Sequence, residues 1–174
     1  MIVLLVMVLV SVVPLPVGAI DPENLTPEEY TMLQNNCKAA QRTMQRIQYV
    51  DPVARVNRGI AYNNISKLMT ALTARAAFNA YSVPQLSVET AAIQEQRTQF
   101  SQDYTDYEIS LRELINLNCK AKPEEFYKRL VEVRSKRAIV TLRVREMDRR
   151  LDAFAGSVTQ LNELIKTRER NAEN

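Results

Sequence analysis

One spacing pattern constrains the fold of this 174-residue chain more than any other feature: near the C-terminus an apolar residue recurs every three or four positions over 40 residues. A period of 3.5 residues, kept this long, favours one long helix with left-handed, coiled-coil-like packing. At 1.5 Å per residue this helix is about 60 Å long. We call the twelve positions the C-terminal seam; all but Arg137 are apolar, and they are Phe126, Leu130, Val133, Arg137, Val140, Val144, Met147, Leu151, Phe154, Val158, Leu161 and Ile165.

Helix breakers are scarce in the rest of the chain, and their positions predict where helices end. After residue 19 the only glycines are Gly59 and Gly156, and between the first expected helix start and the C-terminus the only prolines are Pro52, Pro84 and Pro123. Strand-like alternation is absent, so the fold class is all-α. We expect a single helical domain over residues 20–174, an antiparallel bundle of about four helices at approximately 27–50, 52–80, 88–118 and 123–170.

Two alternatives remain open at Pro52, which either begins a second helix after Asp51 or kinks a continuous one. In the second case a kinked helix over 27–81 folds against 88–172 as one long helical hairpin. At the start of the first helix, Thr26 and Glu29 have the spacing of a capping box around Pro27.

Charge alternates in sign along the expected helices. Residues 52–81 hold four Lys/Arg and no acid, residues 85–119 hold two against six acids, and residues 120–150 hold eleven against five. Opposite signs on consecutive helices favour antiparallel neighbours. Because an exposed ion pair contributes only about 0–1 kcal/mol, the pattern guides pairing more than it stabilises the fold.

The segment 1–19, MIVLLVMVLVSVVPLPVGA, has the apolar run and the small residues at Val17-Gly18-Ala19 of a cleaved signal peptide. It lacks the basic residues that usually precede such a run, so an uncleaved membrane anchor over residues 2–19 is the alternative. Apart from that segment we expect no membrane contact. The expected location is outside the cytoplasm: periplasmic, in the cell envelope or secreted.

The chain has two cysteines, Cys37 and Cys119, each within the sequence Asn-Cys-Lys-Ala. In an oxidising compartment two cysteines are usually bridged, so we expect a disulfide between them. An ideal four-helix bundle conflicts with this bridge, because Cys37 would lie about 20 Å along the axis from the level of Cys119. Either the third helix ends early and its tail folds back, or the first helix is offset from its neighbours.

Composition excludes much enzyme chemistry. The chain has no histidine, so it contains no Ser-His-Asp system, no Cys-His nucleophile and no histidine-liganded zinc site. Two cysteines are too few for a four-cysteine cluster, and the glycines are too few for a phosphate-binding loop. The paired glutamates at 28–29 and 124–125 follow helix-starting prolines and complement the helix dipole. We predict no enzyme, no catalytic residue, no metal site and no cofactor.

The expected last helix carries a basic surface that offers a face for a polyanion or a protein partner. Two readings compete: an anion-binding face, and a solvated face whose charges pair within the bundle. Acidic residues interrupt the stretch and stacking aromatics are missing, and both observations argue against nucleic acid as the ligand. Arg137 is predicted to set the helix register or to pair with a buried acid; the alternative is that the helix leaves the core there and the side chain extends outward. The residues of the face are Lys128, Arg129, Arg134, Lys136, Arg143 and Arg150.

The function expected from the sequence is that of an exported, non-enzymatic helical protein that acts by protein–protein contact. Envelope structural, adhesion-like and holdase-like roles all fit, the partner is unknown, and self-association through the C-terminal seam is one route. The alternatives are a membrane-anchored bundle and a polyanion-binding protein that uses the basic last helix.

Overall fold

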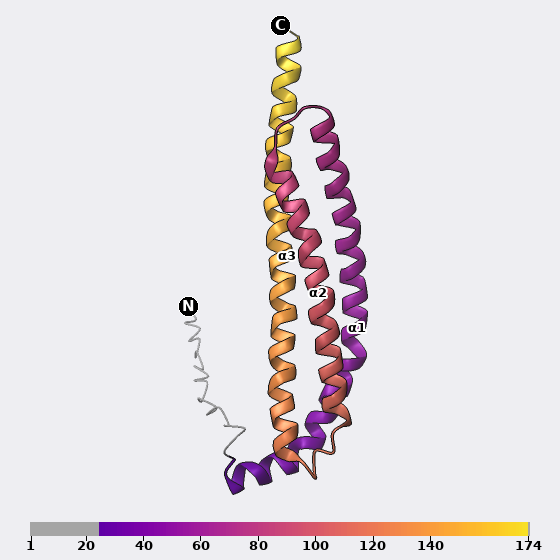
Figure 1. Ribbon diagram of the computed structural model, residues 1–174, viewed down its shortest axis with the longest axis vertical. Helices are drawn as coiled ribbons and strands as arrows, with labels where there is room; N and C mark the ends of the chain where they lie inside the picture. Colours follow the sequence, from indigo (N-terminus) through magenta and orange to yellow (C-terminus); the bar gives the residue numbers. More distant parts are fainter. Residues whose placement is uncertain (1–24, 174) are drawn as a thin grey trace, which may run out of the picture.

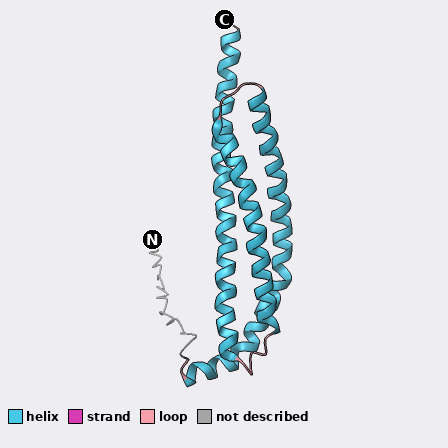
Figure 2. Cartoon of the chain, in the orientation of Figure 1, coloured by secondary structure: helices cyan, strands magenta, loops and turns pink. Residues whose placement is uncertain are grey.

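The computed structural model describes residues 25–173, and this part of the chain folds into three long helices (Figure 1). They are α1 (Pro27–Phe78), α2 (Pro84–Asn116) and α3 (Pro123–Ala172). Adjacent helices run antiparallel, so α1 and α3 point the same way with α2 beside both (Figure 1). Helices and short connections make up the whole described range, in which no strand occurs (Figure 2). The predicted all-α class is confirmed; the signal or anchor segment 1–19 lies outside the described residues.

The expected number of about four helices is wrong, because α1 continues through Pro52. A proline inside a helix removes one backbone hydrogen bond and costs about 3 kcal/mol. Apolar packing on both sides of that point offsets the cost, since the inward face of α1 is buried at Tyr62 and Met69 and partly buried at Met44 and Ile47. The continuous first helix matches the hairpin alternative, whereas the break between α2 and α3 matches the four-helix expectation.

The first part of α1 does not run alongside the other helices. It crosses the lower end of the bundle and then turns upward to lie beside α2 (Figure 1). Its start is fixed by the predicted capping box: the Thr26 hydroxyl accepts a hydrogen bond from the Glu29 amide at 3.2 Å, and the Glu29 carboxylate accepts one from the Thr26 amide at 2.9 Å. The crossing brings the early residues of α1 under the connection between α2 and α3.

Two long periodic faces, on α2 and α3, form most of the core, and the buried face of α1 packs against them. On α2, buried residues recur every seven positions, and on α3 the C-terminal seam faces inward, with every apolar member buried or partly buried against the core. Seven-residue repeats on facing helices allow side chains to interlock along the whole length of the contact. The α2 series consists of Leu86, Ile93, Phe100, Tyr107 and Leu114.

Ion pairs between acidic α2 and basic α3 follow the predicted alternation of charge. Arg143 contacts Asp103 at 2.8 Å, and Arg150 contacts the buried carboxylate of Glu89 at 3.3 Å. These contacts lie beside the closest helix pair of the fold, since α2 and α3 pack more extensively against each other than either does against α1.

The turn that ends α1 contains a residue in the left-handed backbone region. Ala80 has φ 55°, and the amides of Ala80 and Tyr81 donate to the carbonyls of Ala77 and Ala76, at 3.0 and 2.9 Å. This is the hydrogen-bond pattern of a Schellman motif, whose left-handed position is usually glycine because a Cβ is unfavourable there.

Replacing Ala80 by glycine is therefore expected to stabilise the protein by about 1 kcal/mol, because the strained Cβ is removed without loss of a contact in the core. Urea unfolding followed by circular dichroism measures the change as a higher midpoint at an unchanged slope. The matched control is Ala77→Gly, within the helix, which we expect to destabilise by about 1 kcal/mol. A lower midpoint for Ala80→Gly would contradict the assigned turn.

Candidate functional site

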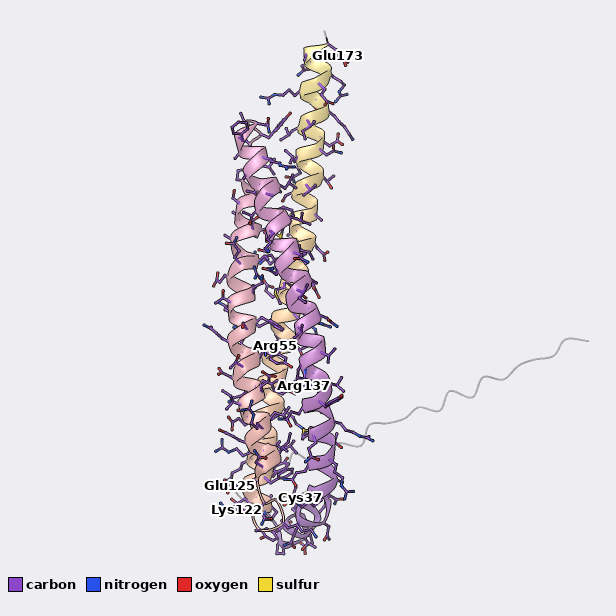
Figure 3. The ribbon with its side chains drawn as sticks, turned by 90° about the vertical axis from the view of Figure 1, so that its right-hand side faces the viewer. Cys37, Arg55, Lys122, Glu125, Arg137 and Glu173 are labelled. Atoms are coloured by element: carbon purple, nitrogen blue, oxygen red, sulfur yellow. A yellow bond between two sulfur atoms is a disulfide. The ribbon has the colours of Figure 1, made fainter. Side chains whose placement is uncertain are left out.

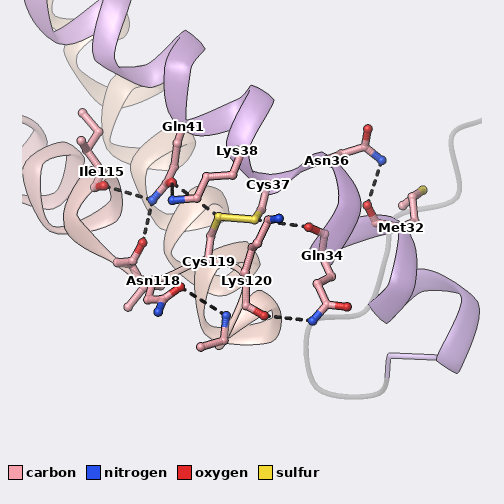
Figure 4. Close-up of a disulfide and its surroundings, with 12 residues drawn as sticks. Met32, Gln34, Asn36, Cys37, Lys38, Gln41, Ile115, Asn118, Cys119 and Lys120 are labelled. Atoms are coloured by element: carbon pink, nitrogen blue, oxygen red, sulfur yellow. Dashed lines mark hydrogen bonds between the residues drawn. A yellow bond between two sulfur atoms is a disulfide. The ribbon is translucent and has the colours of Figure 1, made fainter.

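The two cysteines meet at the lower end of the bundle, where the crossing part of α1 lies against the α2–α3 connection (Figures 3 and 4). Cys37 and Cys119 form a disulfide with their Cα atoms 5.8 Å apart, and both residues are almost fully buried. Both solutions to the geometric conflict contribute, because α2 ends at Asn116, before Cys119, and α1 bends across the end of the bundle. The predicted disulfide is confirmed.

Near the disulfide, two glutamine side chains of α1 donate hydrogen bonds to backbone carbonyls at the end of α2 and in the α2–α3 connection (Figure 4). The buried Gln41 side chain donates to the carbonyls of Ile115 at 3.0 Å and Leu117 at 2.6 Å, which lie where α2 ends. Gln34 donates to the carbonyl of Lys120 at 3.0 Å. Carbonyls at the end of a helix lack partners within it, so these amides satisfy acceptors that burial would otherwise leave unpaired.

A polar cluster interrupts the core midway along α1. Asp51 accepts a hydrogen bond from the Tyr107 hydroxyl at 2.7 Å and forms an ion pair with Arg137 at 3.3 Å. Because α1 is continuous here, Asp51 lies within it and does not cap a second helix. The Arg137 side chain is half exposed, so it leaves the seam toward solvent while still contacting Asp51; its register-setting role stays a prediction.

Three core tyrosines differ in how their hydroxyls are satisfied. The Tyr62 hydroxyl donates to Asp148 at 2.9 Å and that of Tyr107 to Asp51, but the buried hydroxyl of Tyr104 has no hydrogen-bond partner within residues 25–173. Burial, together with the Asp148 hydrogen bond, raises the pKa of Tyr62 to about 12. Burial also raises the pKa of Tyr104 to about 12, and it raises that of Tyr107 well above its ordinary value.

Acids within the bundle neutralise most of the predicted basic face of α3. Lys128, Arg129 and Lys136 pair with glutamates of α3 itself, while Arg143 and Arg150 reach acids of α2. Only Arg134 of the six forms no ion pair with a described residue. The structure does not gather these residues into one site, and polyanion binding there stays a prediction.

The C-terminal seam is covered by the chain's own helices. Its apolar members pack into the shared core, so a second copy could reach them only if the helices parted. The last turns of α3 extend beyond the α1–α2 turn (Figure 1), but their sequence, Lys-Thr-Arg-Glu-Arg-Asn over 166–171, is polar. Arg168 there donates to the Asn79 carbonyl at 2.9 Å.

Sequence reasoning missed a second apolar face on α1, which we call the α1 stripe. It comprises Tyr49, Val53, Val56 and Ile60, whose exposed fractions are 84, 62, 56 and 57 %. Their spacing of four, three and four places them on one side of the helix, away from its buried face. The spacing is visible in the sequence. However, the same helix also carries the apolar residues that face the core, and only the structure shows which of the two faces is buried.

Sequence reasoning also missed a cavity between α1 and α3. Arg55 and Arg58 of α1 line it together with Arg137 and Arg145 of α3, and Tyr104 contributes from α2. Arg55 and Arg137 lie in the lower half of the bundle (Figure 3). The available signal was the excess of basic residues in 52–81, which the sequence alone could not place beside α3.

No helix in residues 25–173 combines the length and the apolarity that a bilayer crossing requires. Membrane attachment through residues 2–19 concerns a segment outside the described part of the chain and stays a prediction.

Loss of the disulfide is expected to destabilise the protein by about 4–5 kcal/mol, because the bridge closes a loop between residues 82 positions apart. The measurement is urea unfolding of the Cys37→Ser/Cys119→Ser variant beside the oxidised protein. The wild type under reducing conditions serves as control and should lose a similar amount. A difference below about 1 kcal/mol would mean that the bridge does not hold the first part of α1.

Alkaline pH is expected to unfold the protein through the buried tyrosines. A folded-state pKa above the unfolded value of about 10 gives stability that is complete below pH 10 and is lost as pH rises through about 12. Phenolate absorbance from Tyr62, Tyr104 and Tyr107 should therefore appear above about pH 11 together with loss of the helical circular dichroism signal. In Tyr62→Phe the pH dependence should become shallower. Ionisation of all seven tyrosines near pH 10, with the helices intact, would contradict the burial.

Comparison of the chain with protein-family models, with curated proteins and with solved structures finds no match. The function must therefore be argued from the site geometry alone.

Proposed function

We propose that the protein is exported and acts without catalysis, by binding another protein through the outer face of α1. The observation that carries this proposal is the α1 stripe, four large apolar side chains more than half exposed on a helix whose opposite face is already buried. An envelope structural, adhesion-like or holdase-like role would use such a surface.

The stripe is unusual for a surface helix. Helices at the edge of a bundle normally have a polar outer face, and a contiguous exposed apolar patch marks a contact surface. Two members of the stripe, Val56 and Ile60, line a groove of about 710 Å³ between α1 and α2 together with Gly59. A side chain built at Gly59 would meet no atom within 4 Å, so the backbone there is open to close approach by another helix.

Charge favours an acidic partner over a second copy. Arg42 and Lys67 lie seven residues beyond either end of the stripe, on the same side of the helix by spacing, and residues 52–78 hold no acid. In an antiparallel pair of two stripes, Arg42 of one copy would face Lys67 of the other. Because like charges in contact are unfavourable, we propose an amphipathic helix of another protein with acidic residues flanking its apolar face.

The disulfide supports export. It is compatible with an oxidising location, in which structural disulfides persist, whereas the cytosol keeps thiols reduced. The periplasm, the cell envelope and the extracellular space all meet this condition.

Site-specific photocrosslinking in the native host tests the proposal. A photoreactive side chain at Val56 should give one adduct heavier than the monomer, and adding Val53→Asp should weaken it several-fold because a buried charge opposes docking. The matched position is Arg134, exposed on α3, where no such adduct is expected. An adduct of twice the monomer mass would contradict the acidic partner and show that the stripe binds a second copy of this chain. Equal labelling at both positions, or none, would overturn the proposal.

A further inference from the structure

The cavity between α1 and α3 has the size and lining of a small-ligand site. Its volume is about 390 Å³, within the range of about 300–1,000 Å³ that is usual for such sites. Aromatic rings of α2, among them Phe100 and Tyr104, form one side, and Val140 and Val144 of α3 add aliphatic surface. The cavity lies between α1 and α3, which pack against each other less extensively than α2 packs against α3.

Positive charge exceeds negative charge around this cavity. Four arginines line it, against two aspartates, and both aspartates already accept hydrogen bonds from core tyrosines. Arg55 pairs with Glu108 at 2.9 Å and Arg137 with Asp51. Arg58 and Arg145 form no ion pair with any described residue, so two guanidinium groups remain for an anion.

A second observation points independently to a missing polar group. Tyr104 lines the cavity, is 5 % exposed, and has the unpartnered hydroxyl described above. Buried hydroxyls in native proteins nearly always have a partner, and an exception requires an explanation. The hydroxyl oxygen is enclosed by protein atoms, so Tyr104 lines the cavity through its ring. The carboxylate that acts most strongly on this hydroxyl is Glu108, which lines a smaller adjoining space between α1 and α2, and the missing partner belongs to that space.

We propose that this cavity binds a small organic anion with an apolar body. The guanidinium groups of Arg58 and Arg145 hold its carboxylate or sulfonate, and the apolar body lies against Phe100, Val140 and Val144. This site is separate from the outward α1 stripe, so the proposal does not depend on the protein-binding function.

Two probes test the site in the oxidised, folded protein. The first is 1-anilinonaphthalene-8-sulfonate, an organic anion with an apolar body whose fluorescence rises when it binds an apolar site. We expect binding at one site per chain and displacement by dodecanoate but not by dodecyltrimethylammonium. Displacement by inorganic phosphate at the same concentration as dodecanoate would overturn the role of the apolar body.

Variants then locate the binding. Arg58→Gln/Arg145→Gln should weaken affinity about tenfold or more, as expected for two charge-assisted hydrogen bonds in a partly solvated site. The control Arg46→Gln/Arg134→Gln removes the same charge outside the cavity and should leave affinity within about twofold. Equal weakening in both double variants, or weakening only in Val53→Asp on the stripe, would overturn the proposal.

Tyr104→Phe gives a readout that does not depend on charge. It should leave probe affinity within about twofold, because the ring that lines the cavity is kept, and it should raise the thermal midpoint of the unliganded protein, because an unpaired buried hydroxyl is removed. Loss of probe binding in Tyr104→Phe would contradict the arrangement in which Arg58 and Arg145 hold the acid group.

Discussion

The fold depends on one covalent constraint, the disulfide between Cys37 in the crossing part of α1 and Cys119 in the α2–α3 connection. α2 and α3 form a well-packed antiparallel pair with matching seven-residue repeats, but α1 packs less extensively on either. The bridge, with Gln41 and Gln34 on nearby carbonyls, fixes the end of α1 against that pair. A loosely packed helix anchored at one end can lie beside a cavity that a tightly packed helix would close.

The parts of the fold that the sequence predicted are those in which a local rule and the tertiary contact agree. The C-terminal seam is periodic because it is buried, Pro123 begins a helix because its φ suits a first turn, and Thr26 caps because Glu29 reciprocates. The predicted start of α2, near residue 88, is wrong, because the helix already begins at Pro84. The tendency of Pro52 to end a helix was overestimated. A proline removes one backbone hydrogen bond, which the sequence reveals, but the apolar contacts that keep α1 continuous depend on the tertiary structure.

The candidate site was harder to predict because it depends on which faces meet. Tyr49, Val53, Val56 and Ile60 have the spacing of a core face, and without coordinates nothing distinguishes their exposure from burial. For the basic residues of α3 the difficulty was the reverse. The sequence predicted a binding surface, but acids of α2 and of α3 itself pair with most of these residues. Arg58 and Arg145 are far apart in the sequence, so only the packing of α1 beside α3 relates them.

The irregularities of this sequence are concentrated at one level of the bundle. Pro52 follows Asp51 in α1, Arg137 replaces an apolar residue in an otherwise regular seam, and α2 contributes Tyr104 with its unpaired hydroxyl, all bordering the same pair of adjoining cavities. A bundle shaped by stability alone would fill this level with aliphatic side chains, because each polar group inside a core costs free energy. Local departures from consistent packing, gathered in one place, are characteristic of a site kept for binding.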